Sequence, residues 1–264
     1  MAKAVSAPSR APSETRYTIA QVGLDRPWFW LARGWQDLRA APMISLGYGV
    51  MFVATGFGLT ALLYALDILY MVLPLAAGFI LIAPILAVGL YELSRRLAKG
   101  EAVTMATPLA AWRRNFGQIA LLGLVLMLFL LAWIRIASLL FVLFFPQAPL
   151  EPGAFVSSVF LSWKSIPFLV IGSGVGAVLA TLVFALSVVS VPMLLDRNVS
   201  AITAMSTSLD AVRRNRKTMM VWAVLIALFT VAGLTTFYVG LAVTLPLIGH
   251  ASYHAYRDLV SVVR

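Results

Sequence analysis

The chain of 264 residues has no cysteine and only two histidines. The absence of cysteine excludes both a disulfide framework and a thiolate metal site. Charged residues are also scarce, at 11%, against about 25% in soluble globular domains. Hydrophobic residues instead make up 61% of the chain, and the mean hydropathy is +0.94. This composition excludes a water-soluble globule and predicts a membrane protein.

The net charge of +10 would suit nucleic-acid binding, because basic patches attract phosphate. The basic residues do not gather on one segment, however, but lie in the gaps between apolar runs. Retention of Lys and Arg on the cytoplasmic side of a membrane produces this distribution. We therefore expect the lipid bilayer as a partner and no nucleic acid.

The N-terminal region differs in composition from the rest. Residues 1–24 are expected to form a disordered cytoplasmic tail, because Met1 to Thr15 is rich in Ala, Ser and Pro. This stretch also lacks the apolar core of a signal peptide. The first long apolar run starts near Met43 and is expected to act as an uncleaved anchor. Residues 25–264 are predicted to form a single membrane domain.

Apolar stretches long enough to cross a membrane follow one another along this domain. A helix needs ~20 apolar residues to span ~30 Å of hydrocarbon. The six predicted spans are residues 43–66, 70–93, 116–140, 166–195, 217–233 and 236–256. A proline-containing loop, residues 144–165, is expected on the far side of the membrane. The stretch 219–256 is ambiguous by length alone, because one long tilted helix would also fit it. The sequence predicts an all-α, polytopic transmembrane helical bundle.

Two internal repeats favour two spans in that last stretch. One set recurs 162 positions later: Gly78, Pro84, Tyr91, Arg95 and Leu97 match Gly240, Pro246, Tyr253, Arg257 and Leu259. A second set recurs 100 positions later: Met105, Thr107, Leu109, Ala111, Arg113, Arg114 and Asn115 match Met205, Thr207, Leu209, Ala211, Arg213, Arg214 and Asn215. The chain is therefore predicted to hold three repeats, each an amphipathic helix followed by a membrane hairpin.

The basic residues also set the predicted orientation. With six spans, 18 of the 20 Lys and Arg residues lie on one side, and only Arg135 and Lys164 lie elsewhere. Cytoplasmic loops carry the excess of Lys and Arg in membrane proteins. Both termini are therefore predicted to be cytoplasmic.

The helix expected at residues 27–39 is the clearest surface feature. Four apolar residues share one face, because their spacings match the helical period: Trp28, Leu31, Trp35 and Leu38. The residues predicted to lie at the membrane interface are Trp28, Trp30, Trp35 and Arg39. The helix is either a passive interfacial anchor or a docking site for a partner.

His250 and His254 are weak candidates for metal ligands. They lie four residues apart on one helix face, as a two-histidine site requires. Two ligands are too few for a closed site, and Asp258 is the nearby carboxylate. Contacts with lipid headgroups or backbone carbonyls are the alternative. We expect no cofactor.

Three further patterns favour packing over catalysis. Glu92 and Arg96 are four residues apart and can pair on a helix. Small residues form a face of the fourth span that suits close helix packing: Gly172, Ser173, Gly176, Ala177 and Ala180. Each returning span has a proline near its cytoplasmic end that would bend it or act as a hinge: Pro84, Pro192 and Pro246. The sequence has no phosphate loop, nucleophile elbow or acidic dyad, so we expect no enzymatic activity.

Three segments resemble a known family: residues 25–28 (Asp-Arg-Pro-Trp), residues 34–38 (Gly-Trp-Gln-Asp-Leu) and residues 245–259, which hold both histidines and end in Ala-Tyr-Arg-Asp-Leu. They resemble a proteobacterial family of predicted integral membrane proteins of unknown function. The resemblance covers nearly the whole chain after the tail. It implies a multi-pass bacterial inner-membrane location, and it implies no activity.

The leading functional hypothesis is a non-enzymatic scaffold or accessory subunit that packs with other membrane proteins or with itself. It depends on the three amphipathic helices, the small-residue faces and the expectation of no buried constellation of charges. The alternative is a transporter, channel or lipid-handling protein, because transporters also use repeats and broken helices.

Overall fold

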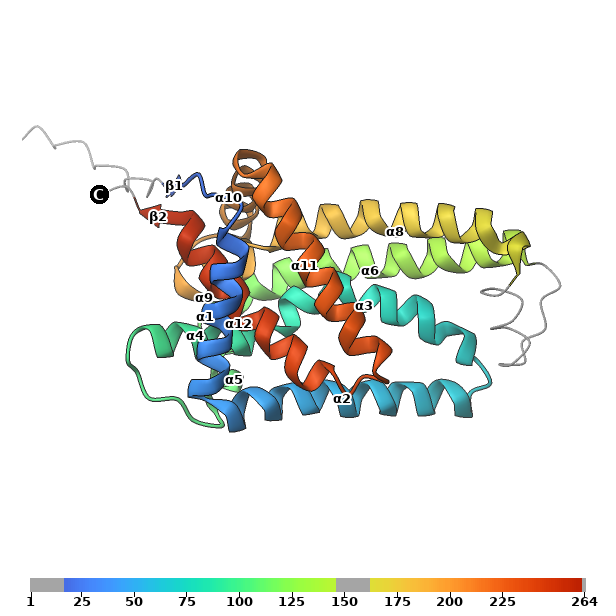
Figure 1. Ribbon diagram of the computed structural model, residues 1–264, viewed down its shortest axis with the longest axis horizontal. Helices are drawn as coiled ribbons and strands as arrows, with labels where there is room; N and C mark the ends of the chain where they lie inside the picture. Colours follow the sequence, from blue (N-terminus) through green and yellow to red (C-terminus); the bar gives the residue numbers. More distant parts are fainter. Residues whose placement is uncertain (1–16, 146–161, 263–264) are drawn as a thin grey trace, which may run out of the picture.

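The computed structural model describes residues 17–145 and 162–262 (Figure 1). The first part contains β1 (Tyr17–Ile19), α1 (Arg26–Ala40), α2 (Pro42–Ala65), the 3-10 turn η1 (Leu69–Met71), α3 (Val72–Leu86), α4 (Val88–Ala98), α5 (Thr107–Ala110), the 3-10 turn η2 (Ala111–Arg113) and α6 (Phe116–Phe144). The second part contains the 3-10 turn η3 (Trp163–Ser165), α8 (Ile166–Ser187), α9 (Ser190–Asp196), α10 (Ala201–Arg214), α11 (Arg216–Thr235), α12 (Leu241–Leu259) and β2 (Val260–Val262). The predicted all-α helical bundle is confirmed. Most of the predicted loop 144–165 lies outside the described residues.

Five helical stretches of the described residues are long and apolar enough to cross a membrane. They are Pro42–Ala65, Leu69–Ala98, Phe116–Phe144, Ile166–Asp196 and Arg216–Thr235. Only 11% of the apolar window of Pro42–Ala65 is buried within the protein, so most of α2 presents apolar side chains outwards. An apolar surface of this kind is compatible with lipid as its solvent. The chain is therefore a multi-pass integral membrane protein.

The ambiguous C-terminal stretch consists of two helices, α11 and α12. Between them the backbone turns at Phe237 and Tyr238, whose φ angles are 51° and 67°. The interpretation as one long helix is therefore wrong. α12 is not among the five candidate crossings, because its second half carries His250, His254 and the charged residues near its C-terminus. The sixth crossing stays a prediction.

The long helices α2, α6 and α8 run along the long axis of the molecule, whereas α1 lies across one end of them (Figure 1). We call this the polar end, because α1, α10 and the two strands gather there. The opposite end, where α2 turns into η1 and where residues 145 and 162 lie, is called the far end. The part of the bundle next to the far end is called the far half.

The first and last helices pack on each other at the polar end. α1 buries Pro27, Trp30, Gly34 and Leu38, whose spacings of three, four and four keep them on one face. A Cβ atom added at Gly34 would lie 2.7 Å from the backbone nitrogen of Ala251 in α12. Only glycine therefore permits the two backbones to come so close.

A two-stranded antiparallel sheet joins the described ends of the chain. β1 pairs with β2, with Tyr17 opposite Val262 and Ile19 opposite Val260. The Asn215 side chain extends this contact, because its Oδ1 accepts from the backbone N–H of Val22 at 2.9 Å. The prediction of a disordered tail is therefore wrong for residues 17–24, since these pairings fix the backbone. Residues 1–16 lie outside the described residues.

Two of the three returning segments are interrupted near their prolines. α3 ends at Leu86, shortly after Pro84, and α4 begins at Val88. α8 ends at Ser187, and α9 then carries Pro192. Proline removes one backbone hydrogen bond and its ring presses on the preceding turn. α12, by contrast, continues through Pro246.

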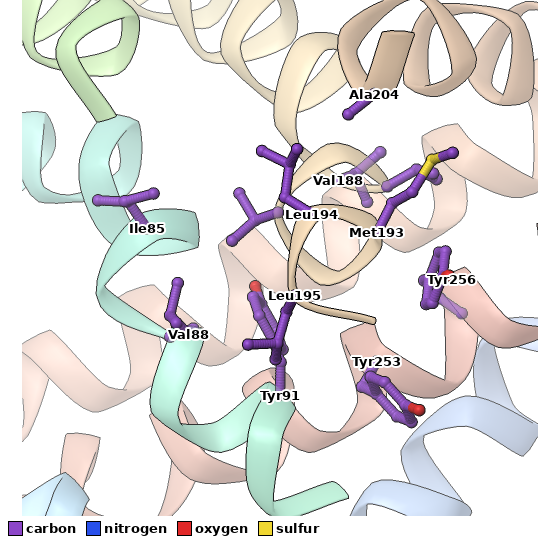
Figure 2. Packing of buried hydrophobic residues seen from close by; sticks show 14 of the residues in the cluster. Ile85, Val88, Tyr91, Val188, Met193, Leu194, Leu195, Ala204, Tyr253 and Tyr256 are labelled. Carbon is purple, nitrogen blue, oxygen red and sulfur yellow. The ribbon is translucent and has the colours of Figure 1, made fainter. Parts of the chain in front are cut away.

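The best-packed core lies at the polar end. Residues 88–95 of α4 and residues 190–195 of α9 are all buried, so both short helices are surrounded by protein. Figure 2 shows the side chains of α9, such as Leu195, lying against Tyr91 of α4 and near Tyr253 of α12. This core fixes the helices that hold the buried polar residues.

Candidate functional site

The buried and half-buried polar residues gather at the polar end in what we call the polar layer. Its members come from α1, α2, α4, α9 and α12: Arg26, Trp30, Asp37, Ser45, Glu92, Ser94, Arg95, Arg96, Asp196, Arg197, His250, His254, Tyr256 and Asp258. They form four groups, centred on Glu92, on Asp258, on the two histidines and on the Tyr256 hydroxyl, which accepts from Arg197 and donates to Asp196. Each group joins residues that are distant in the sequence or lie on neighbouring helix turns.

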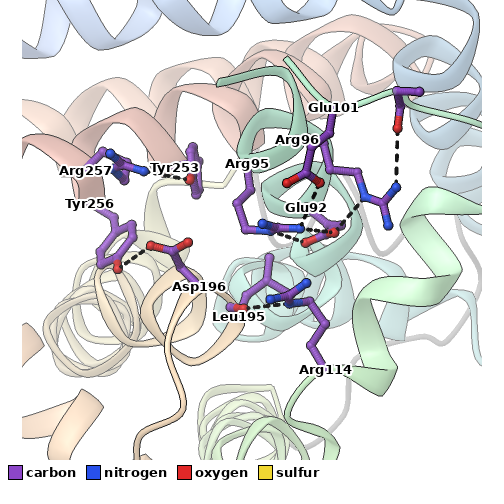
Figure 3. Close-up of polar contacts among 11 residues, drawn as sticks. Glu92, Arg95, Arg96, Glu101, Arg114, Leu195, Asp196, Tyr253, Tyr256 and Arg257 are labelled. Atoms are coloured by element: carbon purple, nitrogen blue, oxygen red, sulfur yellow. Dashed lines mark hydrogen bonds and ion pairs between the residues drawn. The ribbon is translucent and has the colours of Figure 1, made fainter. Parts of the chain in front are cut away.

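The group around Glu92 holds the most deeply buried charges (Figure 3). The Glu92 and Arg95 side chains are 1% and 3% exposed, and Arg95 donates two hydrogen bonds of 2.7 and 2.8 Å to the carboxylate. Arg96 donates a third of 2.9 Å, as the four-residue spacing predicts. The expectation of no buried constellation of charges is therefore wrong. Arg95 follows Glu92 by three residues, a spacing that allows a pair on one helix face, but an arginine between two spans is equally expected from membrane topology.

Asp258 ties α12 to α1. Its carboxylate accepts hydrogen bonds from Arg26 at 2.7 and 2.8 Å and from the indole Nε1 of Trp30 at 2.9 Å. The hydrogen bond and the charge of Asp258 hold the pKa of Arg26 above its ordinary value. Trp30 is 0% exposed and its ring packs edge-on against Trp222. The prediction that Trp30 lies at the membrane interface is therefore wrong, because Asp258 and Trp222 draw it into the protein.

The exposed face of α1 carries the other predicted interfacial residues. Trp28 and Trp35 are 60% and 44% exposed, and Arg39 is also exposed. Of the predicted apolar face, Leu38 is buried, whereas Trp28 and Trp35 lie outside the buried side of α1. The close approach of Gly34 to α12 sets that buried side. The location of Trp28, Trp35 and Arg39 at the lipid headgroups stays a prediction. It is consistent with the exposed side of α1, which is aromatic and basic and has few contacts with the described protein.

The two histidines contact different partners. His250 is fully buried, and its Nε2 and Nδ1 lie 2.9 and 2.8 Å from the hydroxyls of Ser45 and Ser94. Because a hydroxyl can donate and accept, both ring nitrogens are satisfied in either tautomer. His254 Nε2 instead lies 2.8 Å from Asp37 Oδ2. Within residues 17–145 and 162–262, no group of three or more His, Asp or Glu side chains is placed to hold a metal. His250 therefore joins α2, α4 and α12 through hydrogen bonds.

Two asparagines in the polar end were missed by the sequence analysis. Asn115 precedes α6 and donates from Nδ2 to the carbonyls of Leu194 and Val199 at 3.2 Å each. Asn215 precedes α11 and donates to the carbonyl of Ala20 at 3.0 Å. Both residues thus hold a neighbouring backbone segment at the start of a long helix. Their signal was present, since they occupy matching positions 100 residues apart.

The far half of the bundle contains an apolar cavity of 610 Å³ between α3, α6 and α8, which we call the main cavity. Its walls include Ile80, Trp133 and Phe168, together with the small residues of α8. A Cβ atom at Gly172 would meet nothing within 4 Å. The prediction that this small-residue face packs closely on another helix is therefore wrong for Gly172, since the face borders an open space.

A smaller cavity of 90 Å³ lies between α3, α8, α11 and α12, closer to the polar layer. It shares Ile80 and Ala180 with the main cavity, and hydroxyl residues such as Tyr91 and Ser252 line it. Among the residues that the structure describes, neither lining contains an Asp, Glu, Lys, Arg or His side chain. Acid–base chemistry therefore has no charged group at these two cavities.

The comparisons with known proteins concern the middle of the chain. Residues 72–196 match the model of a family described as a predicted integral membrane protein (DUF2189). No curated protein and no solved structure matches the chain. The match runs from the first residue of α3 to the last residue of α9, and therefore leaves out the motif at residues 249–259. From α3 to α9, the chain is similar to a family of membrane proteins of unknown function.

Proposed function

We propose that this chain is a non-enzymatic membrane protein that acts as a scaffold or accessory subunit. The observation that carries the proposal is the use of its buried charges, which bind one another within the polar layer. Glu92 accepts three hydrogen bonds from Arg95 and Arg96, and the Asp258 carboxylate accepts from Arg26 and Trp30. The two carboxylates are thus already paired, Glu92 within α4 and Asp258 with α1, and a paired carboxylate is a poor general acid or base for a substrate.

The surface proposed for partner binding is the outward face of α2. This helix buries only 11% of its apolar window, whereas the stretch of α8 and α9 buries 56%. Val50 and Leu62 are 55% and 54% exposed on α2. Membrane helices associate through van der Waals packing and small residues, and Gly47 and Gly58 have nothing within 4 Å of an added Cβ. The helix therefore offers both an apolar surface and room for close approach.

We further propose that the polar end faces the cytoplasm of a bacterial inner membrane, with an even number of crossings. Supporting this orientation, exposed basic side chains gather at the polar end: Arg33, Arg39, Arg213, Arg214, Arg216 and Lys217. Reporter enzymes fused after residue 264 and inserted in the turn at residues 66–68 would test it. Cytoplasmic activity of the first and periplasmic activity of the second are expected. A periplasmic C-terminus would contradict the sixth crossing.

Photo-crosslinking in intact membranes tests the scaffold role. A photoreactive residue replaces Leu62, which is exposed, and in a matched control it replaces the neighbouring Leu63, which is 6% exposed. Adducts with another protein are expected at position 62 and not at position 63. Native mass spectrometry directly from membranes would then identify the adduct. Lipid adducts alone at position 62, with a single chain in the native spectrum, would contradict the proposal.

Lipid handling is the second candidate function, and the main cavity favours it. Since charged side chains are missing from its lining, ions and protons gain no stabilisation there. A transporter or channel for charged solutes is therefore less well supported than a protein that binds an apolar molecule.

A further inference from the structure

The main cavity has the size of a ligand pocket. Its volume is 610 Å³, and ligand pockets fall in the range of about 300–1,000 Å³. Such pockets are commonly open on one side, as the main cavity is at its rim.

The walls select an uncharged, apolar occupant. They contain aliphatic and aromatic side chains such as Ile80 and Phe168, and they include no Asp, Glu, Lys, Arg or His. Three hydroxyl residues also belong to the lining: Tyr70, Ser138 and Ser173. The Ser138 hydroxyl already donates to the carbonyl of Ile134 at 2.8 Å, so the walls offer little polar surface for the two to four partners that each water needs. A hydrocarbon chain that enters the cavity exchanges one apolar environment for another, because the bilayer around the protein is equally apolar.

The dimensions and surroundings of the cavity match one lipid leaflet. Its α8 wall runs from Phe168 to Ala180, and these twelve steps along a helix cover about 18 Å. Half of a ~30 Å hydrocarbon core measures ~15 Å. Leu73 and Val142 on the rim are 45% and 63% exposed, so the cavity opens onto the surface that faces lipid.

The back wall is held in place rather than free to collapse. Trp133 of α6 donates from Nε1 to the carbonyl of Pro74 in α3 at 2.8 Å, which fixes its ring across the cavity. A Cβ atom at Gly176 would lie 3.2 Å from this ring. Glycine at position 176 therefore keeps the floor of the cavity open beside a fixed indole.

We propose that one acyl chain of a membrane phospholipid occupies the main cavity, with the chain lying along α8 between Phe168 and Ala180. The small residues of α8 form the wall for this chain and are not a helix-docking face. The proposal rests on the cavity alone and does not require the scaffold role. Its failure would therefore leave the α2 crosslinking test unaffected.

The test uses the full chain in nanodiscs of phosphatidylethanolamine and phosphatidylglycerol with a trace of phosphatidylcholine that bears a diazirine in the middle of one acyl chain. After illumination, peptide mass spectrometry maps the adducts. We expect them to concentrate on the cavity walls, around Trp133 and Gly176. Gly172→Leu adds a side chain to the cavity where a Cβ meets nothing, and it should reduce these adducts about tenfold.

The matched control is Gly174→Leu. Gly174 lies two residues further along the same helix, does not line the cavity, and also has nothing within 4 Å of an added Cβ. It should leave the labelling of the cavity walls unchanged, while both variants keep the melting temperature of the parent. Labelling spread evenly over all lipid-facing residues, or an equal loss in both variants, would overturn the proposal. Occupancy of the walls by residues 146–161 or by a second copy, seen as protein–protein crosslinks, would overturn it as well.

Discussion

The polar end and the far half of the bundle are built on different principles. At the polar end, α4 and α9 are buried on all sides, and glycines such as Gly34 bring backbones within contact distance. In the far half, α3, α6 and α8 surround a cavity of 610 Å³, and Gly172 borders empty space. The same chain thus holds a dense half and an open half.

The difference follows from the solvent around each half. In lipid, apolar helices gain no hydrophobic free energy by touching one another, so specific packing and polar contacts must hold them together. The polar layer supplies such contacts through Asp258, which connects α12 to α1, and through His250, which connects α12 to α2 and α4. The far half lacks comparable charged contacts among its described residues. Its helices α3, α6 and α8 leave the main cavity between them. Substitutions in the two halves should therefore have unequal effects on stability.

The largest effect is expected from Glu92→Gln. The substitution leaves the 3% exposed guanidinium of Arg95 without its carboxylate, and breaking a buried pair from one side costs about 3–5 kcal/mol. The free energy of unfolding, measured by titration with a denaturing detergent in mixed micelles, should fall by this amount. Glu101→Gln is the control, because Glu101 is 43% exposed and lies 3.6 Å from Arg95. An equal loss in both variants would contradict the importance of burial.

A smaller loss is expected from Trp30→Phe. Phenylalanine keeps an aromatic ring against Trp222 and removes the N–H that binds Asp258 at 2.9 Å. Hydrogen bonds to charged groups contribute about 1.5–3 kcal/mol, so the same detergent titration should show a loss in this range. Trp28→Phe changes a side chain that is 60% exposed and should shift the value by less than about 0.5 kcal/mol. If the two variants behaved alike, Trp30 would be interfacial after all.

Gly49→Ala should also destabilise the protein, through a steric clash. Gly49 of α2 faces α12, and an added Cβ would lie far too close to the backbone of Ala242. Overpacking of this kind costs about 1–3 kcal/mol, visible as a lower melting temperature by circular dichroism. Gly47→Ala, two residues earlier with nothing within 4 Å, should leave the melting temperature unchanged or raise it.

The smallest effect, and one of opposite sign, is expected from Gly172→Ala in the far half. A Cβ at this position meets no neighbour, and alanine in a helix is more stable than glycine by about 0.5–1 kcal/mol. A slightly raised melting temperature is therefore expected. A lowered one would show that α8 packs more tightly on its neighbours than the open half described above.

The apolar runs in the sequence were sufficient to predict the five described helical stretches that are long and apolar enough to cross a membrane. The predicted spans 43–66 and 116–140 correspond to α2 (Pro42–Ala65) and α6 (Phe116–Phe144). A run of apolar residues is a local property, and the thickness of the bilayer fixes its length. Helix type and approximate bounds could therefore be predicted without knowledge of any contact between helices.

The faces of the helices could not be predicted in the same way. Both the lipid-facing and the protein-facing sides of a membrane helix are apolar, so periodicity carries little information about which side is covered. The same limit applies to α1, which carries a tryptophan on each of two nearly opposite sides, since Trp28 and Trp30 are two residues apart. Periodicity separates these two tryptophans but does not indicate which one is covered: Trp28 is 60% exposed and Trp30 is fully buried. The small residues of α8 were equally ambiguous, because an open wall and a packed interface require the same side chains.

Polar contacts between residues that are far apart in the sequence could not be predicted for another reason. Asp258 forms a salt bridge with Arg26, 232 residues away, and the Asn215 side chain accepts a hydrogen bond from the backbone of Val22, 193 residues away. Nothing in the spacing of such residues indicates their partners. Glu92 and Arg96, four residues apart on one helix, were predictable because helical geometry alone brings them together.

The pairing of α1 with α12 has a consequence for the order in which the protein is assembled. Arg26 and Asp258 are separated by 232 residues, so at ~5–20 residues per second α1 leaves the ribosome roughly 10–50 s before its partner. During this interval the surface of α1 that holds Trp30 and Gly34 has no α12 to cover it. α1 is thus synthesised well before the helix that covers it. Any factor that protects nascent apolar segments would act on α1 while the intervening helices enter the bilayer.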